Sequence, residues 1–587
     1  MLVPMAVELE QRDDPADPPR DRNRVRVAGT LAAAVALTTT VVADALWPRV
    51  PSLVAVVGQA FVRAVPGWFA RFGVESAGSA DKPLVLVGTV VIALIVGAYV
   101  GGAARRRPVV GDAAFAAFGL LGVACASWLG HVSVAGAAVA AVAGALAGAL
   151  SLRLLLSAVA ADDASAEGAV THDPDDPDAA AEGAATAGAG PDAPAREGAD
   201  REGAATEGAG PDDAGPQDPG PEMPGSGVDR RRFLTVGAAT AGGTALALVG
   251  VRGFRWPGTS AGQRAGVRLP APAEPAAAAT AATGGSAPAG LDAEGISPLI
   301  VPNRDYYRID EALVVPQVDV DSWHLNVTGM VDSPFEVSYA ELLAMPLIER
   351  HITLSCVSNE VGGPLVGNAR WLGVRLADLL RRAGVKPGAT QVVGRSVDRF
   401  TVGFPTSVAL DGRDAMVAVG MNGEPLPAAH GFPARLVVPG LYGYVSATKW
   451  LGEIELTTWE KFDAYWIERN WAREGPVKVE SRIDVPQNYS TVRPGPRTVA
   501  GVAWAPHRGV SRVEISVDTG PWREARLSEP LGDDAWRQWA VDWDAEPGEH
   551  EISVRATTGD GETQTDTKKS VFPDGATGRH NVTVRVR

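Results

Sequence analysis

Cysteine is nearly absent from this chain: its 587 residues include only Cys125 and Cys356. Two isolated thiols exclude a disulfide framework, and no cysteine cluster could hold an iron–sulfur centre. The haem-attachment pattern Cys-x-x-Cys-His does not occur, and no glycine-rich phosphate-binding motif follows a strand. Near the first apolar runs the only histidine is His131, which is too few for bis-histidine haem. We therefore expect no haem, no iron–sulfur cluster and no nucleotide cofactor.

Positive charge is also scarce. The formal net charge is -16, and the segment 161–228 alone holds 17 acidic residues against Arg196 and Arg201. The rest of the chain is close to neutral and has no basic patch large enough for nucleic acid. The acidic segment has almost no aromatic or β-branched residues, so burial could not offset its chain entropy. We predict a disordered acidic linker at 158–228 and a second linker, rich in Ala, Pro and Gly, at 253–294.

Charge is missing altogether from five apolar runs of 17 to 22 residues. Crossing a bilayer takes about 20 apolar residues, so each run is a candidate membrane span. A 12-residue run at 51–62 is more typical of an interfacial or re-entrant segment. The pattern predicts a cytoplasmic tail at 1–26, a four-helix transmembrane region at 27–157 and an anchor helix at 229–252. The five runs are 27–43, 83–104, 113–130, 132–152 and 233–251.

Arginine clusters indicate the orientation of these spans. They lie at 22–26, 105–107, 153 and 230–232, and only a cytoplasmic N-terminus places all of them in the cytoplasm. Five crossings then leave everything after residue 251 outside the cytoplasm, tethered to the membrane lipid. The last span begins with three arginines followed by Phe and Leu. This resembles a twin-arginine export signal, although an ordinary positive-inside anchor carries similar charges.

Cys356 is the only thiol after the last span. An alternating apolar segment leads into a polar turn here, which places the sulfur at a strand end. The thiol is therefore a buried inert group, a metal ligand or a nucleophile. A cysteine protease with His351 or His430 as base also fits the pattern. Any group held at Cys356 would be bound largely through this single soft thiolate.

Hydrophobic periodicity divides the external half into two domains. A strand at 323–327, helices at 339–343 and 376–382 and a hairpin turn at Asn422-Gly423 predict a mixed α+β domain at 295–481. Four later segments alternate strictly between apolar and polar residues, which predicts an immunoglobulin-like β-sandwich at 482–587. The fold class is therefore multidomain: a transmembrane helical bundle, an α+β domain and a β-sandwich.

The region from about 298 to 587 resembles the sulfite oxidase family of molybdenum-cofactor oxidoreductases, as a membrane-anchored bacterial type. The resemblance rests on the order and spacing of six blocks: VPNRDYY at 301–307, LSCVSN at 354–359, ARWLGV at 369–374, MNGEPLP at 421–427, HGFPARLVVPG at 430–440 and KWLG at 449–452. It implies that the α+β domain binds molybdenum and a pyranopterin, with Cys356 as the metal ligand. It also implies that the C-terminal domain closes a homodimer.

The resemblance also suggests which side chains serve the site. Arg308 and Tyr465 lie near the family's substrate-binding arginine and tyrosine, in altered spacing, and Tyr465 could equally pack in the core. Arg435 and Lys449 are both suited to binding a buried phosphate. Alternatively, Arg435 could be a solvated strand end, and Lys449 could extend along Trp450 with its charge in solvent. The cofactor contacts implied besides Cys356 are Asn303, Tyr306, Tyr307, Ser396, His430, Arg435, Ser446, Thr448 and Lys449.

The function that follows is two-electron oxygen-atom transfer on a small oxyanion or oxide, outside the cytoplasmic membrane. Oxidation of sulfite to sulfate is the first expectation. Reduction of sulfoxides or related oxides is the second, because the tyrosines around 306 and 442 also resemble a periplasmic sulfoxide reductase branch. A non-catalytic, membrane-anchored binding protein is a third. Without a haem domain, electrons must pass through a separate carrier or a membrane redox partner.

Overall fold

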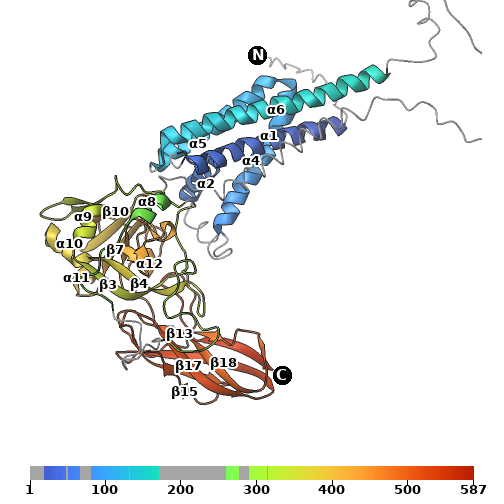
Figure 1. The fold of residues 1–587 in the computed structure, drawn as a ribbon. Coiled ribbons are helices and arrows are strands. Elements are labelled where there is room, and N and C mark those ends of the chain that lie inside the picture. The colour runs from blue at the N-terminus through green and yellow to red at the C-terminus, as the bar shows by residue number, and fades with distance from the viewer. Residues whose placement is uncertain are drawn as a thin grey trace, which may run out of the picture. The chain divides into compact units, whose positions relative to one another are not determined.

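The computed structural model describes residues 19–47, 50–65, 81–130, 132–170, 260–276, 290–313 and 315–587. Figure 1 shows a helical N-terminal part, followed by a part rich in strands. The expected export-type anchor at 229–252 and the segment 171–228 lie outside the described residues. The predictions made for these two segments therefore stay predictions.

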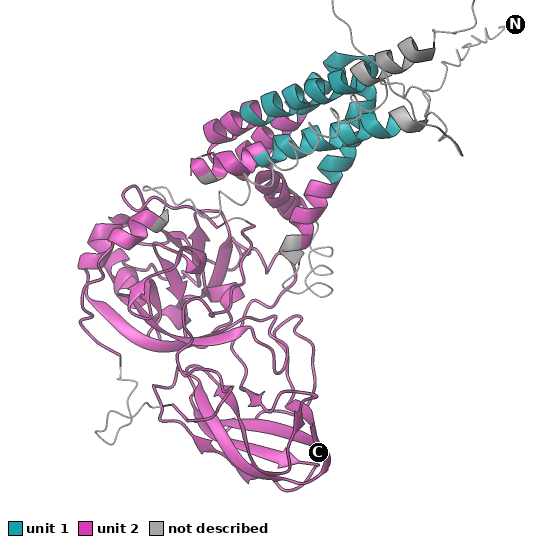
Figure 2. Ribbon diagram, turned by 45° about the vertical axis from the view of Figure 1, so that its right-hand side comes forward, with its two compact units in different colours: residues 1–38, 92–117, 143–248 teal, residues 39–91, 118–142, 249–587 magenta. Residues whose placement is uncertain are grey.

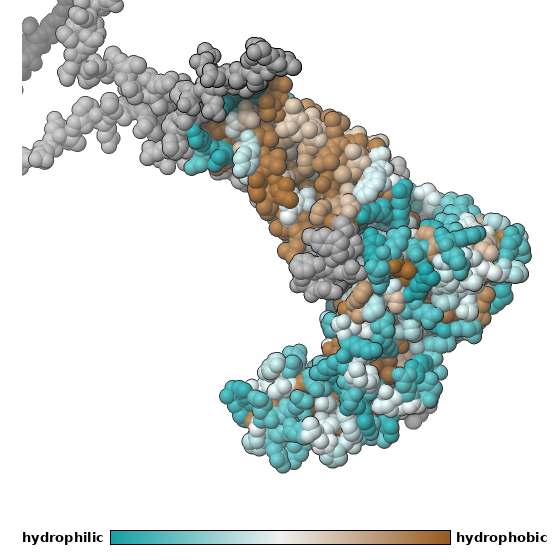
Figure 3. All heavy atoms as spheres, turned by 180° about the vertical axis from the view of Figure 1, so that it is seen from behind, coloured by the Kyte–Doolittle hydropathy of each residue, from teal (hydrophilic) through white to brown (hydrophobic). Residues whose placement is uncertain are grey.

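Long apolar helices form the N-terminal part. Among the residues that the structure describes, four helices are long and apolar enough to cross a membrane, and they overlap the four runs predicted between 27 and 152. Ile92, Leu120 and Leu146 on these helices are 64%, 69% and 67% exposed, and Figure 3 shows hydrophobic residues covering this part. Exposed apolar surface of this kind is compatible with lipid contact. The helices are α1 (Pro19–Leu46), α4 (Asp81–Arg106), α5 (Pro108–Leu129) and α6 (Val134–Val170), with the short α2 (Leu53–Ala64).

The chain divides into two compact units, which Figure 2 distinguishes by colour. In the first unit (1–38, 92–117 and 143–248), α1 and α4 meet through glycines. A Cβ atom added at Gly97 would lie 2.6 Å from the Cβ of Ala33, and one at Gly101 would lie 2.4 Å from the carbonyl oxygen of Val25. These distances leave no room for side chains. The two backbones thus approach as closely as small-residue interfaces in membranes allow.

Helix α6 extends further than the sequence pattern predicts. It continues to Val170, ten residues into the segment from 161 for which the acidic composition predicts disorder. Alanine has the highest helix propensity, and this stretch holds four alanines. A helix already established in the apolar run can therefore propagate into it, since only nucleation is costly.

The second unit contains an α+β domain built on two sheets. In the sheet of order β2-β1-β10-β5-β6, only the β1/β10 pair is parallel. In the antiparallel sheet β3-β4-β7-β8, β9 also pairs with β7. The strands are β1 (His324–Gly329), β2 (Phe335–Ser338), β3 (Leu347–Ser355), β4 (Val366–Arg375), β5 (Gln391–Ser396), β6 (Thr401–Pro405), β7 (Met416–Met421), β8 (Glu424–Pro425), β9 (Arg435–Val437) and β10 (Leu451–Thr457).

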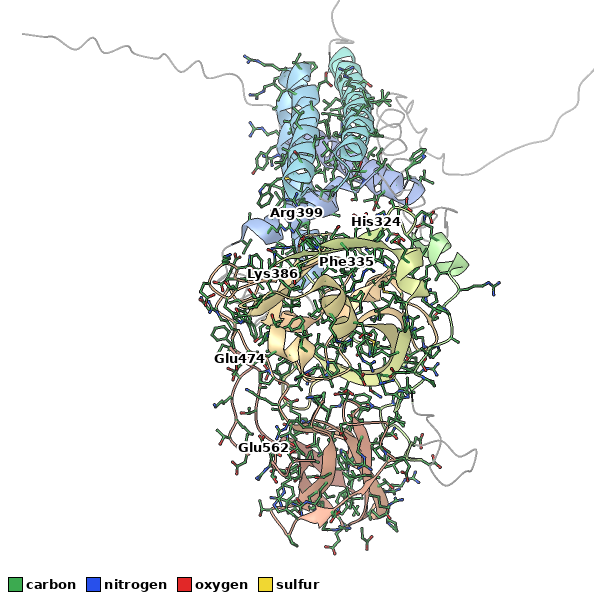
Figure 4. The ribbon with its side chains drawn as sticks, turned by 90° about the vertical axis from the view of Figure 1, so that its left-hand side faces the viewer. His324, Phe335, Lys386, Arg399, Glu474 and Glu562 are labelled. Atoms are coloured by element: carbon green, nitrogen blue, oxygen red, sulfur yellow. The ribbon has the colours of Figure 1, made fainter. Side chains whose placement is uncertain are left out.

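The local predictions for this domain are confirmed. Helix α9 (Tyr339–Ala344) is capped at its N-terminus by Ser338, which forms a capping box with Glu341. Helix α10 (Leu376–Ala383) buries its apolar stripe and ends at Gly384 in the left-handed conformation. Its Arg382 lies 4.0 Å from the ring centroid of Phe335, which Figure 4 labels. Asn422 and Gly423 both have positive φ, as the two-residue hairpin between β7 and β8 requires.

The C-terminal domain consists of two further sheets around one apolar core. Their orders are β11-β13-β17-β16 and β12-β19-β18-β14-β15. The alternating segments of the sequence form the long strands, and their apolar faces point into this core; the immunoglobulin-like connectivity stays a prediction. The strands are β11 (Glu480–Val485), β12 (Thr491–Val492), β13 (Gly495–Trp504), β14 (Val510–Val517), β15 (Arg523–Glu524), β16 (Arg526–Leu527), β17 (Arg537–Ala545), β18 (Gly548–Thr558) and β19 (His580–Val586).

Candidate active site

Cys356 directly follows β3, at the strand end that the sequence pattern predicts. Its backbone N–H donates to the carbonyl oxygen of Leu365 at 2.9 Å, where the chain returns into β4. Asn359 closes the turn between them, because its N–H donates to the carbonyl oxygen of Cys356 and its side-chain oxygen accepts from the N–H of Leu365. The half-buried thiol is thus held in a short turn with a fixed backbone.

The surroundings of the thiol act on its pKa in opposite directions. Burial raises the pKa of Cys356, whereas hydrogen bonds from the backbone and side chain of Ser358 and the positive charge of Lys449 lower it, and burial dominates. The free thiol therefore stays protonated at neutral pH. A thiophilic metal ion would replace that proton, and the Ser358 donors would then stabilise the thiolate.

Tyr306 and Tyr307 lie close enough to Arg435 for its charge to lower the pKa of both hydroxyls, against the larger effect of burial. The Tyr306 hydroxyl donates to the carbonyl oxygen of Gly367 at 2.8 Å, and the two tyrosine rings stack with centroids 5.3 Å apart. Burial raises the pKa of Tyr307, which also interacts electrostatically with Cys356. The Tyr307 hydroxyl therefore keeps its proton and can donate a hydrogen bond near the sulfur.

His430 is neutral and has a defined tautomer. It ends a 3₁₀ turn, and its Nε2 donates to the carbonyl oxygen of Asn303 at 3.1 Å. Burial, followed by the charge of Arg435, lowers the pKa of His430 to about 4. Its ring lies edge-on to Tyr306, with centroids 5.6 Å apart.

Arg435 is a buried cation without a carboxylate partner among the described residues. Two of its N–H groups donate to backbone carbonyls, at 3.2 Å to His430 and 3.4 Å to Leu436. Burial lowers its pKa, and the guanidinium lies 5.0 Å from the ring centroid of Trp371. An uncompensated buried charge is costly, so this environment calls for an anion. Its burial contradicts the alternative that Arg435 is a solvated strand end.

Lys449 reaches the same site from the segment before β10. Its Nζ lies 2.6 Å from Oδ2 of Asp310, and the Nε of Arg308 lies 2.8 Å from that same oxygen. Burial lowers the pKa of Lys449 to about 8, against the opposing effect of Asp310. Lys449 also lies 5.0 Å from the Trp450 ring, as the snorkelling alternative expects, but its charge is buried and paired.

Four of the remaining expected cofactor contacts differ in how their polar atoms are used. Asn303 forms hydrogen bonds with Asn422 and Glu424. The Ser396 hydroxyl accepts one from the N–H of Asp398, and the Ser446 hydroxyl donates one to the carbonyl oxygen of Tyr442. Thr448 is fully buried, and its hydroxyl oxygen has no partner in the part of the chain that the structure describes. An orphaned hydroxyl next to Lys449 is another group that a bound ligand could satisfy.

Tyr465 lies in a separate aromatic group. Its ring packs against Phe400 and Trp466, and the guanidinium of Arg469 lies 3.6 Å from its centroid. Burial raises the pKa of Tyr465, and the Glu311 carboxylate raises it further. These contacts agree with the packing alternative for Tyr465. Arg308 is different, because its charge lowers the pKa of both His430 and Lys449. We therefore count it with the groups around Cys356.

The site uses side chains that the sequence did not single out. Ser358 donates hydrogen bonds to the Cys356 sulfur. Asp310 forms ion pairs with Arg308 and Lys449. The ring of Trp371 faces the guanidinium of Arg435. Ser358 follows the thiol by two residues and could have been proposed from that spacing. Asp310 had no such signal, because its second partner is 139 residues away.

The C-terminal domain supports the turn that carries the thiol. Trp536 donates its backbone N–H to the hydroxyl of Thr353 on β3 at 2.7 Å, and Arg482 donates to the carbonyl oxygen of Gly363 at 2.8 Å. Glu480 is buried beside the amide of Asn359, and burial raises its pKa to about 8. A neutral carboxyl therefore faces the Cys356 turn at neutral pH.

Comparisons with known proteins agree on one family. The family model described as the oxidoreductase molybdopterin binding domain matches residues 312–466. Human mitochondrial sulfite oxidase is 30% identical over 302 residues, 43% of this chain and 55% of that protein. Sulfite oxidase of Arabidopsis thaliana is 30% identical over 285 residues, 40% of this chain and 72% of that protein. The chain thus spans about half the length of the animal relatives that it matches.

A solved structure is also similar. The sulfane dehydrogenase SoxCD from Paracoccus pantotrophus matches with 23% identity and a TM-score of 0.45, over 49% of this chain and 82% of that one.

Proposed function

Because this chain belongs to the sulfite oxidase family of molybdenum-cofactor oxidoreductases, we propose that it is an oxidoreductase that binds molybdenum and a pyranopterin at Cys356. The observation that carries the proposal is the presence, in one domain, of a thiol in a rigid turn and a buried arginine that has no carboxylate partner among the described residues. A pyranopterin carries a phosphate, which Arg435 could bind, and its sulfur atoms hold molybdenum, to which Cys356 could add one more soft ligand. When bound, the cofactor supplies two-electron oxygen-atom transfer.

The chain's own groups would have distinct roles. Cys356 would ligate the metal through a thiolate held by Ser358, and Arg435 would bind the phosphate with the hydroxyl of Thr448 close by. Tyr307 would donate a hydrogen bond, because burial keeps its hydroxyl protonated. Arg308, whose side chain is 39% exposed, would attract a substrate oxyanion from solvent. His430 would stay neutral and position Asn303.

Sulfite is the substrate that we propose first. Sulfite and water give sulfate, two protons and two electrons, and a separate carrier or membrane partner would accept the electrons. The names of the curated relatives and the cations near Cys356 support this choice. Reduction of an uncharged sulfoxide is the second candidate, because Asp310 neutralises part of that positive charge.

We further propose that the helical part holds the enzyme in the cytoplasmic membrane, with the catalytic domain outside the cytoplasm. The exposed apolar helices support the first point, and the arginine distribution supports the second. The C-terminal domain would form the homodimer contact.

Purification of the full chain in detergent tests the enzyme assignment. Molybdenum and pterin should be present in equal amounts, and turnover should appear either with sulfite and an artificial acceptor or with methionine sulfoxide and an artificial donor. Cys356→Ala should remove turnover, whereas Cys125→Ala, which changes the only other thiol, should not. Protein without molybdenum or pterin would favour the non-catalytic alternative.

A further inference from the structure

We propose that Asp310 is a specificity-determining residue that weakens the binding of oxyanions at the Cys356 site and so favours substrates and products of low negative charge. The inference rests on the proposed function. The Asp310 carboxylate already pairs with Arg308 and Lys449, so it competes for these cations with any anion that enters the site.

The geometry places this carboxylate between two cations. One oxygen of Asp310, Oδ2, lies 2.8 Å from Arg308 Nε and 2.6 Å from Lys449 Nζ. The Asp310 side chain is 4% exposed, whereas Arg308 is 39% exposed. An oxyanion arriving from solvent would therefore meet Arg308 first, with the negative charge of Asp310 directly behind it.

The same cations belong to the thiol site. Lys449 acts on Cys356, and both Arg308 and Lys449 act on His430. Arg435, buried and without a carboxylate among the described residues, supplies a third positive charge. If Arg435 serves the cofactor phosphate, the two remaining cations face one carboxylate, which leaves one net positive charge. A dianion is then bound less strongly than two free cations would bind it.

Two variants separate charge from packing. Asp310→Asn removes the negative charge and keeps the shape, whereas Asp310→Glu keeps the charge and lengthens the side chain. Asp305→Asn is the matched control, because Asp305 is 55% exposed and pairs with Arg304, which is 86% exposed. Burial lowers the pKa of Lys449 to about 8 while Asp310 raises it, so the binding measurements belong at pH 6, well below that value.

The experiment measures sulfate binding to the detergent-purified full chain by calorimetry, together with KM values for sulfite and methionine sulfoxide. Asp310→Asn should tighten sulfate binding about tenfold or more, or 1.4 kcal/mol, and lower the KM for sulfite. The KM for the uncharged sulfoxide should change less than about twofold, and Asp310→Glu and Asp305→Asn should resemble the unmodified protein.

Three outcomes would overturn the proposal. They are unchanged or weaker sulfate binding in Asp310→Asn, equal effects of Asp310→Asn and Asp310→Glu, and loss of molybdenum from Asp310→Asn, which would assign Asp310 to cofactor assembly instead. Absence of molybdenum or of any turnover in the unmodified protein would count against the proposed function. Sulfate binding needs no turnover, so the two failures are distinguishable.

Discussion

The guanidinium of Arg435 lies 5.0 Å from the ring centroid of Trp371, buried and without a carboxylate partner in the described ranges. The aromatic face offers the cation partial compensation. Full compensation requires an anion, which we propose to be the cofactor phosphate. We expect this relationship to favour anion binding and to lower the stability of the cofactor-free chain.

Replacing Arg435 should separate these two effects. Arg435→Met is expected to stabilise the cofactor-free chain by about 1–4 kcal/mol, because it removes an uncompensated buried charge. The same variant should lose most of its molybdenum and pterin. Unfolding curves and metal analysis measure the two results, with Arg381→Met, at an exposed position on α10, as the control. Normal cofactor content in Arg435→Met would contradict the phosphate assignment.

Ser358 should tune the thiol. Ser358→Ala removes one of the hydrogen bonds that lower the pKa of Cys356, so that pKa should rise further above its ordinary value. The measurement is the alkylation rate of Cys356 against pH, in cofactor-free protein that also carries Cys125→Ala. The pH at which this rate rises should be higher in Ser358→Ala than in protein that keeps Ser358. A rate profile that stays in place or moves to lower pH would show that the Ser358 hydroxyl does not act on the sulfur.

Sulfate inhibition should depend on pH through Lys449. Burial lowers the pKa of Lys449 to about 8, so the lysine is charged below this pH and loses its charge above it. Sulfate keeps its charge over this range, and its inhibition constant should rise about several-fold between pH 7 and pH 9. Lys449→Arg should flatten the profile. Glu480 titrates in the same range, so Glu480→Gln serves as control and should leave the rise in place.

Glu480 should make stability fall with increasing pH. Burial raises its pKa to about 8 in the folded chain, from a usual value of 4.5, so between these values the folded state binds the extra proton and unfolding releases it. Glu480→Gln should therefore gain stability over the unmodified chain as pH rises from 5 to 8, on the order of a few kcal/mol. Thermal unfolding at both pH values measures this. The exposed Glu474→Gln, labelled in Figure 4, should show no such gain.

Local elements were predictable because local physics determines them. The strand before Cys356, the α10 stripe and the Asn422-Gly423 turn each follow from periodicity or from backbone conformations that few residues adopt. Cys356 and Arg435 were also proposed as site residues from the sequence, and the structure shows both of them on the β-sheet domain that the family model matches. Asp310 was not, because its role arises only when the fold brings Lys449 against it. For Tyr465, spacing suggested the substrate side, whereas its ring packs against Phe400 and Trp466, so a role in binding substrate stays a prediction.

The measurement that tests the central claim most directly is X-ray absorption at the molybdenum edge, on the unmodified chain and on Cys356→Ser. Cys125→Ser is the control, because it removes the other thiol. We predict bound molybdenum with one sulfur ligand fewer in Cys356→Ser and unchanged sulfur coordination in Cys125→Ser. Identical sulfur coordination with and without Cys356, or no molybdenum in the unmodified protein, would contradict the account.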